Sequence, residues 1–190
     1  ADGMIFVALA NMVQAFNADT LESLWVYTDP LGGQPNSPIT YRNGYIYTGF
    51  WNSETSNANW VCLSVTDENP AKATEAKKPV WTYTQRGGFY WAGAYVSDKF
   101  LLVGTDDGEM GYTSSAAGLL SMDPKTGRVI DYLAGIGADI RCTICYDKQT
   151  DRYYFTSKGG YFYSVAVDSE GYIDHNSLKK LDLRGGRTGS

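Results

Sequence analysis

Short runs of β-favouring residues, separated by polar turns, recur along the chain, and no long helical periodicity lies between them. Each repeat contains a polar turn pair that is followed by a run rich in aromatic and branched apolar residues. Four such anchor segments resemble one another, at residues 2–7, 43–48, 98–103 and 151–156. Their spacing of roughly 41 to 55 residues predicts one small sheet in each repeat.

Three further runs complete each repeat around its anchor. A second run follows the anchor, at residues 12–16, 60–65, 119–122 and 161–167. A shorter run comes after the next polar turn, at residues 24–27, 80–83, 129–133 and 178–183. Another run precedes the anchor in three of the repeats, at residues 37–41, 92–96 and 141–146. We label these four predicted strands A, B, C and D, with the anchor as strand B.

This pattern predicts an all-β chain, a β-propeller of four-stranded antiparallel blades. The first repeat lacks strand A, so we expect about three and three-quarter blades of a partial ring. A single partial propeller domain would span residues 1–190, with blades at about 1–30, 31–85, 86–134 and 135–184 and the start of a next blade at 185–190. Residues 70–78 have the composition of a helical turn but lie where a C–D loop belongs.

A blade of this kind keeps its two apolar faces dry only by packing against neighbouring blades. An open arc therefore has two apolar faces that need cover. We expect either the remaining blades of the same protein or a second chain to complete the ring.

Composition and charge exclude two classes of partner. The formal net charge is −5 and the sequence has no basic stripe, so we expect no binding to nucleic acid. No apolar run approaches the roughly 20 residues that a membrane-spanning helix needs. The 15 Tyr and 5 Trp residues instead favour strands and provide flat apolar surfaces for binding.

Two turns carry a more specific pattern. Residues 15–25 read AFNADTLESLW and residues 121–128 read SMDPKTGR. Both resemble the A-L-D-x-x-T-G-x-x-x-W repeat of pyrroloquinoline-quinone-type propellers. Asp123 and Gly127 suit a tight C–D turn, and Trp25 and Trp81 stand at the position that packs between blades. The third repeat has Asp131 at this position and the fourth has no Trp there.

That family contains quinone-dependent dehydrogenases and cofactor-free relatives, among them an outer-membrane assembly scaffold lipoprotein and many bacterial surface proteins. The chain has neither a vicinal cysteine pair nor an obvious calcium-binding set of side chains, features that the quinone enzymes use. The resemblance therefore implies a non-enzymatic binding or scaffolding module without a cofactor, located outside the cell, on its surface or in the periplasm.

Two enzyme hypotheses stay open. The chain could be a fragment of an alcohol or sugar dehydrogenase that uses pyrroloquinoline quinone and calcium, with the quinone near Trp91. It could also be a hydrolase or lyase propeller, although His is scarce and no paired-carboxylate motif is present.

The reactive residue types form no coherent catalytic set. Cys142 and Cys145 form a CxxC, but on a predicted strand they should be small buried residues that point to opposite faces, and Cys62 supplies no second pair for zinc. His175 is expected in a solvated turn. Residues 105–109 (TDDGE) are expected to form an acidic hairpin loop between strands B and C.

The aromatic residues of two connections predict the binding site. In propellers the D–A and B–C loops share one face, and three consecutive aromatics cannot all point into one side of a sheet. Residues 86–93 (RGGFYWAG) and 51–60 (WNSETSNANW) combine flat rings with amide groups, which suits a glycan, a peptide or a small molecule. The alternative is that these rings pack between blades. The candidate ligand-binding residues are Trp51, Trp60, Arg86, Phe89, Tyr90 and Trp91.

Overall fold

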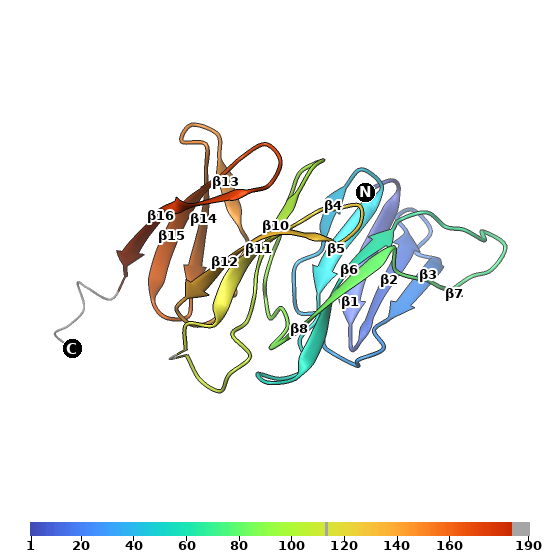
Figure 1. Cartoon of the computed structure of the whole chain (residues 1–190). Helices are drawn as coiled ribbons and strands as arrows, with labels where there is room; N and C mark the ends of the chain where they lie inside the picture. The colour runs from blue at the N-terminus through green and yellow to red at the C-terminus, as the bar shows by residue number, and fades with distance from the viewer. Residues whose placement is uncertain (113, 184–190) are drawn as a thin grey trace.

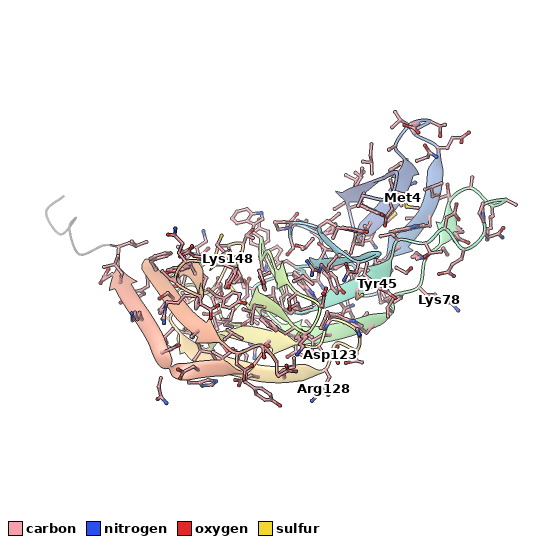
Figure 2. All side chains as sticks on the ribbon, turned by 90° about the horizontal axis from the view of Figure 1, so that it is seen from above. Met4, Tyr45, Lys78, Asp123, Arg128 and Lys148 are labelled. Atoms are coloured by element: carbon pink, nitrogen blue, oxygen red, sulfur yellow. The ribbon has the colours of Figure 1, made fainter. Side chains whose placement is uncertain are left out.

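A computed structural model describes residues 1–112 and 114–183, and these residues form four separate four-stranded sheets. The sheets follow one another along an arc, with the N-terminal sheet at one end and the C-terminal sheet at the other (Figure 1). The ring is not closed, and the view from above shows the curve of the arc (Figure 2). The predicted partial β-propeller is confirmed. The expected start of a next blade at 185–190 lies outside the described residues.

Each sheet is built from the strands of one predicted repeat, and the first sheet also contains one short strand from the second repeat. Blade one holds β1 (Met4–Leu9), β2 (Met12–Asn17), β3 (Ser23–Thr28) and, at its outer edge, β7 (Glu75–Ala76). Blade two holds β4 (Thr40–Arg42), β5 (Tyr45–Gly49), β6 (Asn57–Ser64) and β8 (Trp81–Arg86). Blade three holds β9 (Tyr95–Val96), β10 (Leu101–Gly104), β11 (Ala117–Met122) and β12 (Val129–Ile136). Blade four holds β13 (Cys145–Asp147), β14 (Arg152–Ser157), β15 (Tyr161–Val167) and β16 (Ile173–Asp182).

Blade one lacks strand A, as predicted, so β1 is the inner edge of its sheet. Its fourth strand is β7, which comes from the loop between β6 and β8 of blade two and pairs in parallel with β3. Residues 70–78 lie in the loop between β6 and β8, where a C–D loop was expected, and Glu75 and Ala76 of this loop provide hydrogen-bonding partners for the open edge of β3. Lys77 continues the pairing, since its N–H donates to the carbonyl of Val26 over 2.7 Å.

The hydrophobic core is divided among the three contacts between consecutive blades. Val13, Trp25, Ile46 and Leu63 belong to the cluster between blades one and two, and all four are fully buried. A second cluster joins blades two and three, and a third joins blades three and four. Because strand side chains alternate between two faces, each central sheet contributes to two clusters.

The predicted docking tryptophans each donate a hydrogen bond to the next blade. Trp25 Nε1 donates to the carbonyl of Val65 over 3.2 Å, and Trp81 Nε1 donates to that of Pro124 over 2.9 Å. At the equivalent position in blade three, Asp131 accepts a hydrogen bond from the N–H of Ile173 over 2.8 Å and lies 3.1 Å from His175 Nε2. His175 is exposed as expected, but it lies within β16 rather than in a turn. The polar replacement of Trp therefore also links two blades.

Gly127 in the C–D turn of blade three provides a test of this docking. Its φ is +71°, and a Cβ at this position would lie 2.6 Å from the ring of Trp81. We expect Gly127→Ala to lower the free energy of unfolding for two reasons. The left-handed backbone costs about 1–2 kcal/mol for a residue with a Cβ, and overpacking against Trp81 costs a further ~1–3 kcal/mol. Urea denaturation measures the change.

Gly44→Ala is the matched control, because Gly44 has a φ of +80° with open space around its missing Cβ. This variant should show the strain alone, about 1–2 kcal/mol. Equal losses for the two variants would show that Gly127 does not have to be small for Trp81 to dock.

Candidate functional site

Three aromatic rings from two loops stack on the face of the arc that carries the B–C loops and D–A connections. Trp51 lies between β5 and β6, and Tyr90 and Trp91 lie between β8 and β9. The ring centroids of Trp51 and Tyr90 are 4.6 Å apart, and those of Tyr90 and Trp91 are 4.1 Å apart. We call these three residues the aromatic row. Trp91, at the end of the aromatic row, is 47% exposed. Tyr112 of the β10–β11 loop is 48% exposed.

The backbone before the aromatic row requires glycine. A Cβ on Gly87 would lie 2.6 Å from the backbone nitrogen of Gly108, and a Cβ on Gly88 would lie 2.7 Å from the Cβ of Ala58. Both glycines have positive φ, and Trp91 also has a φ of +55°. A left-handed conformation is unfavourable for a bulky residue, so the surrounding contacts must stabilise the conformation of Trp91.

A buried arginine lies behind the aromatic row. The side chain of Arg141 is only 3% exposed, and its Cζ lies 4.8 Å from the ring centroid of Tyr90. Its Nη2 lies 2.6 Å from Glu54 Oε2, 2.7 Å from Asp106 Oδ2 and 3.0 Å from Asp139 Oδ2. We call Arg141 and these three acidic residues the arginine cluster.

The arginine cluster joins three blades. Glu54 comes from the β5–β6 loop of blade two, and Asp106 comes from the β10–β11 loop of blade three. Asp139 and Arg141 come from the connection that enters blade four. Oδ1 of Asp139 also accepts a hydrogen bond from the N–H of Asp107 over 2.9 Å. The cluster therefore fixes the loops of this face relative to one another.

Burial changes the protonation of the cluster. Removal from water raises the pKa of Asp106 to about 8 and the pKa of Asp139 to about 6. Burial opposes the charge of Arg141, but its hydrogen bonds with Asp106 and the nearby carboxylates outweigh this effect and raise its pKa. The guanidinium thus stays charged, while Asp106 is largely protonated at neutral pH.

The carboxylates fit arginine better than a metal ion. Oxygen atoms of Glu54, Asp106 and Asp139 all lie within 4.8 Å of one another, close enough for a divalent cation to bridge them. Each of the three, however, already pairs with the guanidinium of Arg141. Calcium would have to displace this buried side chain, so we assign the cluster a structural role.

The six sequence-predicted site residues separate into three groups. Trp51, Tyr90 and Trp91 form the aromatic row. Arg86 is exposed near them, with Nη2 3.8 Å from Glu109 Oε1. Trp60 and Phe89 are fully buried between blades two and three, where their rings pack edge to face with centroids 5.3 Å apart. They support the loops from below and are not accessible to a ligand.

Four further residues of this face were not predicted from the sequence: Tyr112, Asp139, Arg141 and Lys158, whose Nζ lies 5.6 Å from the ring centroid of Trp91. Residues 105–109 lie in the loop between β10 and β11, as predicted, but Asp106 and Asp107 are buried there. A signal was present in the sequence. Asp139 and Arg141 flank Ile140 in a connection that should be buried near the axis, and buried charges need partners of opposite sign.

The cysteines lie differently from the prediction. All three are free, and Cys62 is buried, which raises its pKa to about 12. Cys145 is exposed, and it lines the same cavity of about 310 Å³ as the half-buried Cys142. The predicted alternation fails because β13 begins only at Cys145, and Cys142 Sγ instead accepts a hydrogen bond from the N–H of Thr156 over 3.2 Å.

Comparison with known proteins supports the fold and no family. No family model matches the sequence, and no curated protein matches it. The chain is similar to solved structures titled BamB from Moraxella catarrhalis, with 15% identity and a TM-score of 0.62, and mitotic checkpoint complex, with 14% identity and a TM-score of 0.60. The alignments cover 94% and 91% of this chain but only 45% and 48% of those chains. The chain thus has a β-propeller fold and spans about half the length of these relatives in structure. Among the described residues, no helix has the length and apolar character to cross a membrane.

The raised pKa of Asp106 predicts how stability depends on pH. Between about pH 4 and about pH 8 the unfolded chain has released this proton while the folded chain still holds it, so the free energy of unfolding should fall as pH rises. In Asp106→Asn this fall should be smaller by about 1 kcal/mol or more.

Urea denaturation of both proteins across this range measures the difference. Asp98→Asn is the control, because the ion pair with Arg42 lowers the pKa of Asp98 and places its titration below this range. An unchanged slope in Asp106→Asn would mean that Asp106 is ionised in the folded protein.

Proposed function

We propose that the chain is a non-enzymatic binding or scaffolding part of a larger propeller of the pyrroloquinoline-quinone type, in an exported or cell-surface protein. One observation carries the proposal: the aromatic row ends in an exposed Trp91 that is fixed in a strained conformation. Exposed aromatic side chains on a rigid support are typical of binding surfaces. The family resemblance of the C–D turns supports the export and the scaffolding role.

The pairing of the buried charges favours binding over catalysis. Glu54, Asp106 and Asp139 all contact Arg141, so none is positioned as an accessible general acid or base. Pyrroloquinoline quinone is itself a polycarboxylate, and the carboxylates of the nearby arginine cluster disfavour its binding. These features support a cofactor-free module, with a protein, glycan or small molecule as the ligand.

The open face of blade one supports the proposal that further blades complete the ring. Ile5, Val7 and Leu9 alternate along β1 and are 43%, 42% and 69% exposed. Ile5 pairs with Phe16 in the way that Ile46 pairs with Leu63 in blade two, where both residues are fully buried by blade one. The exposed side chains of blade one thus occupy positions that are covered in blade two.

Blade four has an open face at the other end of the arc. Tyr154 and Phe162 stack with ring centroids 5.7 Å apart on adjacent strands, and Leu181, which pairs with Phe162, is 58% exposed. We propose that additional blades, from the same protein or a second chain, cover both ends.

The binding function can be tested on arrays of peptides and glycans. We expect the 190-residue chain to bind members of one ligand class, and Trp91→Leu to reduce this binding at least tenfold through loss of ring stacking. Leu21→Ala is the control, because Leu21 is exposed in the turn between β2 and β3, at the opposite ends of the strands from the aromatic row. This variant should bind like the parent chain. Dye reduction with added quinone and calcium on alcohols or aldoses should give no turnover, and turnover would favour the dehydrogenase.

The ring-completion proposal predicts association through β1. The parent chain should sediment as a species larger than a monomer, because about 25 cal/mol is gained for each Å² of apolar surface that is buried. The double variant Val7→Lys and Leu9→Lys should be a monomer. Met110→Lys is the control, since Met110 is also exposed but lies in a loop away from β1. A parent chain that stays monomeric at every concentration would count against a second copy as the cover.

A further inference from the structure

The B–C loop of blade four places a lysine over the exposed end of the site. Lys158 lies between β14 and β15, and its Nζ is 5.6 Å from the ring centroid of Trp91 and 5.7 Å from that of Tyr112. Its backbone N–H donates to the carbonyl of Asp139 over 2.9 Å, so the base of the side chain is fixed. Ion pairs among the described residues do not include Lys158.

Two cations on this face contact aromatic rings, and they differ in freedom. Arg141 is buried and pairs with three carboxylates, so it cannot leave. Lys158 is exposed, and in the part of the chain that the structure describes its ammonium group contacts only the two rings. Aromatic faces attract cations within about 6 Å of the centroid, and this attraction is weak at exposed sites. A second cation can therefore displace Lys158 from the rings.

The surrounding charges favour such an exchange. Five acidic residues lie in or beside the site, and three basic residues accompany them: Glu54, Asp106, Asp107, Glu109, Asp139, Arg86, Arg141 and Lys158. Because Asp106 is largely protonated, four acidic groups remain against three basic ones, and this excess favours cations over anions. A neutral glycan would gain nothing from this arrangement.

We infer that Trp91 and Tyr112 form a site for a cationic side chain, the lysine or arginine of a protein partner, and that Lys158 occupies this site until the partner binds. This inference rests on the proposed binding function and adds the chemistry of the ligand. The shared chemistry is an ammonium or guanidinium group against two rings. Lys158 acts as an internal competitor, so its removal should strengthen binding.

Titration with a short lysine-containing peptide tests the inference, with the same peptide carrying norleucine in place of lysine as the neutral probe. NMR shifts of the tryptophan indole protons report binding to the full chain. We expect the lysine peptide to bind and the norleucine peptide to bind more weakly by about 2- to 10-fold. Added salt should weaken binding of the lysine peptide.

Three variants separate this role from a structural one. Lys158→Ala should bind the lysine peptide about 2- to 10-fold more tightly, and Trp91→Leu should lose binding. Lys148→Ala, which removes an exposed lysine from the β13–β14 turn, should bind like the parent chain. Unchanged or weaker binding in Lys158→Ala would overturn the inference.

A neutral oligosaccharide distinguishes failure of the inference from failure of the proposed function. If the oligosaccharide binds in a Trp91-dependent manner and both peptides do not, the face is a binding surface but the cationic ligand is wrong. If neither the peptides nor the oligosaccharide binds, the inference fails together with the binding role of the aromatic row.

Discussion

Stacking of each sheet on its neighbour is the constraint on which the rest of this structure depends. Within the described residues no blade has a core of its own, because the three hydrophobic clusters lie between blades. Trp25 and Trp81 add direction to this packing, since each indole N–H must reach one carbonyl of the following blade. Apolar burial provides the driving force, and these hydrogen bonds fix how far each sheet is rotated relative to the next. The position of every loop on the face that carries the aromatic row follows from that rotation.

The arginine cluster applies the same constraint to the loops. Glu54 and Arg141 are 87 residues apart in sequence and come together only because blades two and four flank the loops of blade three. A buried ion network contributes little net stability, because desolvation offsets the attraction, but the loss of one member leaves the others unpaired. The network therefore specifies one arrangement of the loops. The ring of Tyr90 contacts the guanidinium of Arg141, so the network also holds the aromatic row in place.

The strands were predictable and the site was only partly so, for physical reasons. Alternation and turn chemistry are local, so the four repeats and the docking position of Trp25 could be recognised directly. The choice among neighbouring aromatics is not local. Phe89 points into the core while Trp91 is exposed, and the difference depends on the positive φ of the two preceding glycines and of Trp91 itself. The pairing of Asp106 with Arg141 depends on the rotation between blades, which no single segment encodes.

In the proposed site, the two cations of the face divide stability and recognition between them. A group that is paired on every side cannot exchange partners, so Arg141 maintains the shape of the face and is not available to a ligand. Lys158 has no such ion pair within residues 1–112 and 114–183, and its ammonium group lies 5.6 Å from the ring centroid of Trp91. A neutral residue at position 158 would leave the rings of Trp91 and Tyr112 without a cation. A lysine held there by ion pairs would keep a ligand away from them. The contact between Lys158 and the rings is intermediate in strength. In the proposed site, a partner that provides a cation together with further contacts can therefore replace Lys158.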